Sequence, residues 1–379
     1  MAVTPPAPRA AYIHVPFCHR RCGYCNFTVL AGHDERIDDY LRALEIELRG
    51  LGTPRPVDTL FIGGGTPTRL PLPHWARLLD LVARWFPLRP GGEWTVEGNP
   101  EDVSFERVSV AVERGVTRWS LGVQSFLPWK RGFLEREHTG ETIDRAIESC
   151  RQSGAQVAVD LIFALPDETA SDWHSDLDQL LARPVQHVST YSLTLEKGTA
   201  FWSRWYKGLL QPLEEDRQAE LYLATRRRLR AAGFQHYEIS NFALPGCRCR
   251  HNETYWLCGQ YDAAGPGAAR FVGGVREVNH RSTTTWMRRL FAGDSPVAER
   301  ETIGAELAAR ERLIFGLRRL EGIDVREFEE ATGFRLDALA GPAIDEFLAA
   351  GFLEQSGTTL RLSEPGILVS DTLWPALLG

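Results

Sequence analysis

The sequence lacks several features that would assign it to a membrane, secreted or nucleic-acid-binding class. No apolar run approaches the roughly 20 residues of a membrane-spanning helix. The first residues, MAVTPPAPRA, lack the apolar core and cleavage site of a secretory signal. Positive charge is not in excess either, since the net charge is −7 and phosphate backbones require a basic face. We therefore expect a cytoplasmic protein that does not bind nucleic acid.

A disulfide framework is also missing, because the seven cysteines are odd in number and unevenly placed. Six of them fall in two tight groups, a distribution typical of metal or redox chemistry. The first group is Cys18, Cys22 and Cys25, the second is Cys247, Cys249 and Cys258, and Cys150 stands alone.

Apolar runs rich in β-branched and aromatic residues alternate with helical patterns through the first half of the chain. Residues 38–50 and 142–154 show the spacing of amphipathic helices, and the second ends at Gly154. Strict alternation predicts a parallel sheet with right-handed crossovers, and hence an α/β fold with a partial (β/α)6 barrel of the TIM type. Functional groups should then lie at the carboxyl ends of the strands. The predicted strands are residues 11–16, 58–63, 94–98, 118–125, 157–165 and 187–195.

From Glu301 onward the pattern changes to two or three helices and a hairpin, with Ser356 and Gly357 in its turn. This resembles a small α+β winged-helix-like module. Residues 301–379 hold 14 acidic and 7 basic side chains, so we expect a lid or packing module rather than a DNA-binding one. The predicted domains are an N-terminal tail (1–10), the barrel core (11–235), a linker region that covers the barrel (236–300) and the C-terminal domain (301–379).

Cys18, Cys22 and Cys25 have the spacing C-x3-C-x2-C on a loop after the first predicted strand. A structural zinc site needs four protein ligands, and the fourth would have to be His14, His19 or a distant residue. Three thiolates suit a 4Fe-4S cluster held at three corners, with one iron open for a small molecule. We therefore predict cluster ligands, with zinc or idle thiols as the plainer alternative.

Further motifs accompany this loop: YIHVPFC before it, then GGGTP, EGNP, LGVQSF, DLIFALP, HYEISNF, HNETYW and GPGA. Together they make the sequence resemble the HemN/HemW branch of radical S-adenosylmethionine (SAM) proteins over roughly residues 10–375. In that family the amino and carboxylate groups of SAM chelate the open iron. The resemblance implies that the SAM site is lined by Tyr12, Gly64, Gly65, Thr66, Glu97, Gln124, Arg136 and Asp160.

The chemistry of these residues agrees with the resemblance. Glu97 and Arg136 offer opposite charges to a zwitterionic methionine, while Gln124 and Asp160 offer hydrogen bonds to a ribose. Backbone groups of Gly64, Gly65 and Thr66 could bind the amino group of the methionine part of SAM, where a side chain would block approach. Each residue alone is more often solvated or capping, but together they favour a SAM site.

The branch of the family is indicated by Phe27, which stands where HemN-type coproporphyrinogen III decarboxylases have a further cysteine. Phe27 and HNETYW are similar to HemW-type proteins, which are regarded as heme chaperones. That resemblance implies a 4Fe-4S cluster, SAM and heme as cofactors. It also implies heme-acceptor proteins as partners, among them a transient membrane-associated one. If SAM is cleaved, an electron donor is a further partner. The alternatives are a SAM-radical enzyme acting on a porphyrinogen and a redox-sensing iron–sulfur protein. Reductive SAM cleavage and the oligomeric state stay open.

His251, the first residue of HNETYW, is the candidate axial ligand of heme. Tyr255 and Trp256 follow it and offer planar side chains to a macrocycle or equally to the protein core. A histidine among aromatic residues is just as often a packing residue, and Ala269 replaces a histidine usual in HemW-like chains. The second cysteine group surrounds His251, but unconnected thiols are favoured over a second metal site.

Overall fold

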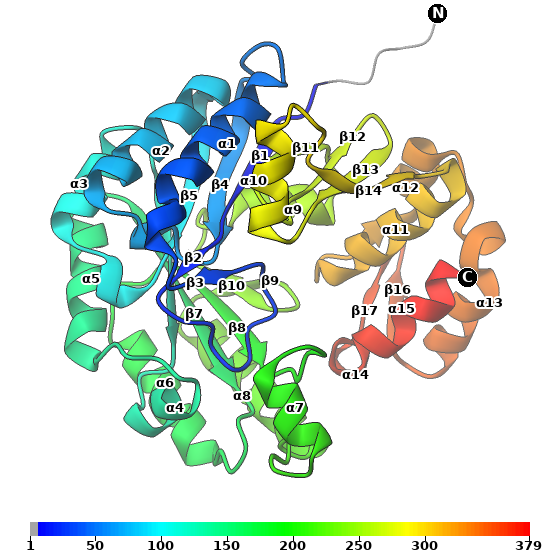
Figure 1. Ribbon diagram of the computed structural model, residues 1–379. Coiled ribbons are helices and arrows are strands. Elements are labelled where there is room, and N and C mark those ends of the chain that lie inside the picture. Colours follow the sequence, from blue (N-terminus) through cyan, green and yellow to red (C-terminus); the bar gives the residue numbers. More distant parts are fainter. Residues whose placement is uncertain (1–6) are drawn as a thin grey trace, which may run out of the picture.

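The computed structural model describes residues 7–379; residues 1–6 of the predicted tail lie outside the described part. A twelve-stranded sheet forms the centre of the fold, in the order β14-β13-β12-β11-β1-β4-β5-β6-β7-β8-β10-β9 (Figure 1). The strands from β11 to β8 run parallel. All six predicted strands are present, as β1 (Ala10–Val15), β4 (Val57–Gly64), β5 (Leu88–Gly98), β6 (Arg118–Gln124), β7 (Gln156–Phe163) and β8 (His187–Ser192).

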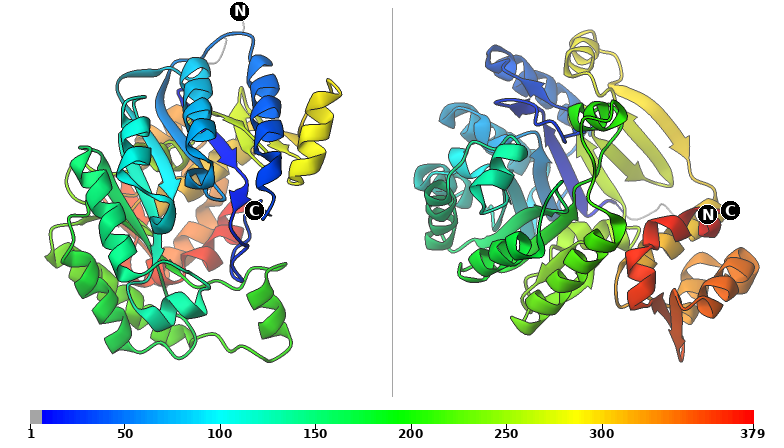
Figure 2. Two further views of the ribbon diagram at one scale, coloured as in Figure 1. Left: turned by 60° about the vertical axis from the view of Figure 1, so that its left-hand side comes forward. Right: turned by 90° about the horizontal axis from the view of Figure 1, so that it is seen from below.

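Helices connect these strands along the outer side of the curved sheet, as the views in Figure 2 show. Helix α1 (Ile37–Arg49) shows why the helices pack against the sheet. Its residues Leu41, Leu44 and Leu48 are buried, as the spacing predicted, and its charged face is turned to solvent. The helices are α1 (Ile37–Arg49), α2 (Leu72–Trp85), α3 (Phe105–Val112), α4 (Pro128–Phe133), α5 (Gly140–Gln152), α6 (Ala170–Leu181), α7 (Ala200–Tyr206) and α8 (Glu215–Ala231).

The region 236–300, expected to be a linker that covers the barrel, instead extends the sheet at both ends. Its strands are short and mix polar with apolar residues, so no apolar run marks them in the sequence. The outermost, VAERET, is largely exposed and charged, as suits an edge strand. The sheet therefore stays open, which confirms a partial barrel. The added elements are β9 (Gln235–Glu238), β10 (Asn241–Ala243), α9 (Arg250–Trp256), β11 (Tyr261–Ala264), β12 (Ala269–Val272), β13 (Val275–Asn279), α10 (Thr283–Phe291) and β14 (Val297–Thr302).

The C-terminal part forms a second hydrophobic core beside the barrel. The predicted hairpin is present, and Gly357 in its turn has φ +59°. No helix in residues 7–379 is long and apolar enough to cross a membrane. The elements are α11 (Ala305–Arg318), β15 (Ile323–Asp324), α12 (Val325–Thr332), α13 (Leu336–Ala349), β16 (Leu353–Ser356), β17 (Thr359–Leu362), α14 (Glu364–Leu368) and α15 (Ser370–Leu378).

Candidate cofactor site

The first cysteine group lies on a loop that leaves the carboxyl end of β1. Two short parallel strands, β2 (Phe17–Cys18) and β3 (Leu30–Ala31), close its base. Within the loop the Cys25 amide donates to the Cys22 carbonyl at 3.0 Å, which turns the chain between the two thiols. The loop therefore holds Cys18, Cys22 and Cys25 over the strand ends, and none of the three forms a disulfide.

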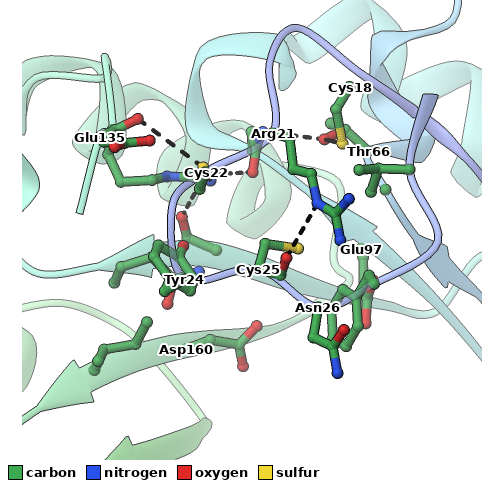
Figure 3. A pocket seen from close by; sticks show the side chains of 18 of the residues that line it. Cys18, Arg21, Cys22, Tyr24, Cys25, Asn26, Thr66, Glu97, Glu135 and Asp160 are labelled. Carbon is green, nitrogen blue, oxygen red and sulfur yellow. Dashed lines mark hydrogen bonds between the residues drawn. The ribbon is translucent and has the colours of Figure 1, made fainter. Parts of the chain in front are cut away.

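A cavity of about 620 Å³ opens under this loop at the carboxyl ends of the parallel strands. Figure 3 shows the three cysteines around the loop, with Glu97 and Asp160 on the opposite wall. The structure thus brings together residues of β2, of the five parallel strands from β4 to β8, and of the loops that follow them. Seven of the eight residues predicted to contact SAM line this cavity: Gly64, Gly65, Thr66, Glu97, Gln124, Arg136 and Asp160.

The eighth, Tyr12, lines a smaller adjoining cavity of about 290 Å³. Gly64 and Glu97 line both cavities, so Tyr12 lies next to the predicted SAM site rather than in it. The phenol of Tyr12 contacts Nδ1 of His14 at 3.1 Å. Ala269, the residue that replaces a usual histidine, also lines the smaller cavity.

The glycine turn after β4 is required by close packing against the first strand. A Cβ on Gly64 would lie 2.6 Å from the His14 ring, and the Gly64 φ of +110° disfavours other residues. A Cβ on Gly65 would lie 2.8 Å from the Pro16 backbone. The Gly64 amide donates to Glu97 Oε2 at 2.9 Å, so the turn and the carboxylate form one unit.

Two carboxyl groups, Glu97 and Asp160, face this cavity without a salt-bridge partner among the described residues. Among residues 7–379, no arginine, lysine or histidine forms an ion pair with Glu97 or Asp160. Burial, and then the charge of Asp160, raise the pKa of Glu97 to about 8. Burial also raises the pKa of Asp160 to about 6, although Ser189 and Ser120 oppose the shift. A bound cation would relieve both carboxyls, and the ammonium of a methionine group is such a cation.

The three cysteines line the cavity together with Arg136. Over residues 7–379 no three His, Cys, Asp or Glu side chains converge closely enough to hold one metal ion. The separated sulfurs face the cavity, and Arg136 Nη1 donates to Cys22 Sγ at 3.8 Å. Burial raises the pKa of the Cys18 thiol to about 11, because the buried thiolate is poorly solvated. A bound metal would stabilise that thiolate, since metals bind the deprotonated form of cysteine.

Comparison with known proteins decides the family. The chain is 33% identical over 378 residues to the heme chaperone HemW of Bacillus subtilis, covering 98% of this chain and 99% of that protein. It is 36% identical to the heme chaperone HemW of Mycobacterium tuberculosis, covering 100% and 97% of the two chains. The chain belongs to the HemW family of radical SAM proteins.

Family models and a solved structure agree with this membership. The radical SAM superfamily model matches residues 12–180, and the HemN C-terminal domain model matches residues 305–369. The structure of Escherichia coli coproporphyrinogen III oxidase HemN superimposes with a TM-score of 0.87 at 20% identity, covering 99% and 91% of the two chains. That likeness shows the fold. Radical SAM membership implies SAM and a 4Fe-4S cluster as the cofactors of the family.

The HNETYW motif does not reach the cavity. His251 is 1% exposed, and its Nδ1 and Nε2 lie 3.0 Å from Thr59 Oγ1 and 2.8 Å from the Tyr255 hydroxyl. Burial lowers the pKa of His251 to about 3, so the ring is neutral. In this structure both ring nitrogens of His251 are hydrogen-bonded within the core, so His251 acts as a packing residue. His251 is not available as an axial heme ligand here.

The motif instead lies near the amino ends of the central strands, away from the cavity. Thr59 of β4 contacts His251, whereas Gly64 at the other end of β4 lines the cavity. Thr59 and Gly64 are five positions apart, which corresponds to about 16 Å along the strand. On β5, the Glu93 carboxylate accepts the backbone amides of Arg250 and His251, capping α9.

Sequence reasoning missed several residues that shape the cavity. Asn99 donates to Thr66 Oγ1 at 3.2 Å and also accepts from Arg136, so it links the glycine turn to the arginine. Ser120 Oγ donates to Asp160 at 3.2 Å. Glu135 Oε2 accepts the Gly23 amide in the cysteine loop at 2.8 Å. Asn99 and Ser120 stand in motifs already recognised, EGNP and the strand RWSLGVQS, and Glu135 directly precedes Arg136; these positions were the available signal.

Proposed function

We propose that this protein binds heme and delivers it to acceptor hemoproteins, and that it carries a 4Fe-4S cluster with SAM beside it. The observation that carries the proposal is identity of 33–36% over the full chain to proteins named heme chaperone HemW. The loop of Cys18, Cys22 and Cys25 would hold the cluster. We place the protein in the cytoplasm, with heme acceptors, one of them transiently at a membrane, as its partners.

The residues of the larger cavity divide the recognition of SAM between them. Glu97 would accept the ammonium group, because a cation there neutralises the paired carboxyls. Arg136 would bind the methionine carboxylate; its Nη2 already donates to the Gly122 carbonyl at 3.0 Å, which fixes the guanidinium in place. Asp160 and Gln124 would contact the ribose, and the turn from Gly64 to Thr66 would follow the amino-acid backbone. A bound cluster supplies the electron that reductive SAM cleavage requires.

Tyr12 would contribute from the adjoining cavity. It contacts the His14 ring, and that ring fixes Gly64 by steric contact. We therefore assign Tyr12 a positioning role at the SAM site. His251 is assigned no role in heme binding in this conformation, since its ring is enclosed.

A SAM-radical enzyme acting on a porphyrinogen is the second candidate. The fold similarity to HemN favours it, but at 20% identity that similarity concerns the fold alone. Phe27, which is 60% exposed, stands at the position of a cysteine in HemN-type motifs. This difference in the cysteine loop favours the chaperone.

One anaerobic experiment separates these functions. The protein is reconstituted with iron and sulfide, and heme and SAM are then added in turn while the optical spectrum and release of 5′-deoxyadenosine are followed. We expect about one heme per chain, as for a single site. SAM turnover on a porphyrinogen without heme binding would favour the enzyme, and neither heme binding nor SAM turnover would favour a redox sensor.

The same preparation tests the cluster assignment. Replacement of Cys18, Cys22 or Cys25 by Ser should abolish the roughly four irons per chain of a 4Fe-4S cluster. The matched control is Cys150→Ser, at a buried thiol far from the loop in sequence. Iron that persists in the triple variant, or stoichiometric zinc in its place, would contradict the assignment.

A further inference from the structure

Helix α7 presents large apolar side chains to solvent beside the cysteine loop. Trp205 is 42%, Tyr206 73% and Leu209 69% exposed. The rings of Trp202 and Tyr206 stack at 5.2 Å between centroids with an interplanar angle of 12°. We call Trp202, Trp205, Tyr206 and Leu209 the α7 shelf. Contiguous exposed apolar groups of this kind mark binding surfaces in soluble proteins.

Basic side chains flank the α7 shelf in sequence, although the whole chain carries a net charge of −7 and the carboxylates Glu214, Glu215 and Asp216 follow a few positions later. Residues 196–210 contain Lys197, Arg204 and Lys207, all exposed, against a single carboxylate, Glu196. The chain has only one other lysine, Lys130, which is buried in ion pairs with acidic side chains. Both exposed lysines of the sequence therefore flank the shelf, and an anionic ligand is favoured.

Helix α7 is fixed directly to the cysteine loop. The Phe201 amide donates to the Gly23 carbonyl at 2.8 Å, and the buried Phe201 ring packs on Phe133 at 5.1 Å and on Tyr24 at 6.2 Å. Figure 1 and the left view of Figure 2 show α7 next to the free end of that loop. The shelf is thus adjacent to the cavity but outside it, and a ligand there would leave the cavity free for SAM.

We propose that the α7 shelf is the docking site for heme, an inference that rests on the heme-binding function proposed above. Heme is a flat aromatic macrocycle with two carboxylates. Its ring suits the exposed face of Tyr206, whose other face stacks on Trp202, while the tilted Trp205 ring would contact its edge. Its carboxylates suit Lys197 and Lys207. An open surface also suits a cargo that must be passed to another protein. Recognition by stacking and charge needs no axial ligand, so iron-free protoporphyrin should bind as well.

The test is titration of the reconstituted full-length protein with heme and with protoporphyrin, followed by absorbance. Trp205→Ala/Tyr206→Ala should weaken binding of both about tenfold, which corresponds to about 1.4 kcal/mol. Trp129→Ala is the matched control, because Trp129 is 40% exposed on the distinct helix α4. The iron–sulfur spectrum should be unchanged in both variants, which verifies that they fold.

Charge reversal gives an independent test, since Lys197→Glu/Lys207→Glu should weaken binding of both porphyrins and increase its salt dependence. If Trp205→Ala/Tyr206→Ala binds heme with wild-type affinity, the α7 shelf is not the docking site, although the proposed function stands. Loss of binding to anionic phospholipid vesicles with unchanged heme affinity would overturn the docking site in favour of a membrane contact. If the wild-type protein binds no heme, the proposed function fails, and the docking site with it.

Discussion

At the residue scale, Glu97 is central to the cavity because it contacts the glycine turn and faces Asp160. Glu97→Gln keeps the side-chain shape and an oxygen for the Gly64 amide, but it cannot ionise and so cannot form the carboxylate that would bind an ammonium group. We expect at least a tenfold loss of SAM affinity, measured by the change that SAM causes in the electron paramagnetic resonance spectrum of the reduced cluster. Arg136→Ala should have a similar effect.

The control for this pair is Glu141→Gln, at an exposed carboxyl near Arg136 in sequence that does not line the cavity. It should leave the SAM response unchanged. SAM binding that is unaffected in both the Glu97 and Arg136 variants would show that the predicted SAM residues are assigned wrongly even though the fold is right.

His251 allows a prediction about pH. The folded protein keeps its ring neutral down to about pH 3, whereas in the unfolded chain it takes up a proton below its ordinary pKa of 6.5. The stability that neutral His251 contributes is therefore complete above pH 6.5 and falls as the pH drops toward 3. At pH 5 the loss is about 2 kcal/mol.

His251→Gln cannot take up that proton, so its free energy of unfolding should fall less between pH 7 and pH 5 than that of the wild type. Urea denaturation at the two pH values measures the difference. The variant should keep its heme Soret band, because the ring is enclosed. A variant with the wild-type pH dependence, or one that loses heme, would contradict the packing role.

At the element scale, the cysteine loop and α7 meet at a position where only glycine fits. A Cβ on Gly23 would lie 2.4 Å from the Phe201 ring. Gly23→Ala must therefore displace the loop or the helix, and we expect a lower iron content after reconstitution together with a loss of about 1–3 kcal/mol in stability. Gly140→Ala is the control, since nothing lies within 4 Å of a Cβ added at the start of α5. Normal cluster assembly in Gly23→Ala would show that the loop does not depend on α7.

At the scale of the whole molecule, α9 links the barrel to the C-terminal domain. Trp256 packs on Phe315 of α11 at 6.1 Å, and the Arg318 guanidinium lies 4.6 Å from the Trp256 ring centroid. Trp256→Ala should lower stability by about 2 kcal/mol, less than for a fully buried tryptophan because this ring is partly exposed. Hydrogen exchange should increase in α11. Unchanged exchange there would mean that other contacts hold the domain in place.

The sequence by itself determined the features that depend on local pattern. Alternating apolar runs defined the six parallel strands, and the cysteine spacing and glycine turn indicated a cofactor site at their carboxyl ends. The structure places all of these together because parallel strands present their carboxyl ends at one edge of the sheet.

Only the tertiary structure decided where the remaining segments lie. His251 meets Thr59, 192 positions away, and this contact buries a motif that the sequence offers equally as a ligand or as core. The edge strands of residues 236–300 carry too few apolar residues to be recognised until a neighbouring strand supplies their hydrogen bonds. Phe201 likewise reaches Gly23 only in the folded chain. Local pattern fixes which groups are present, whereas contacts between distant residues fix which of them reach solvent.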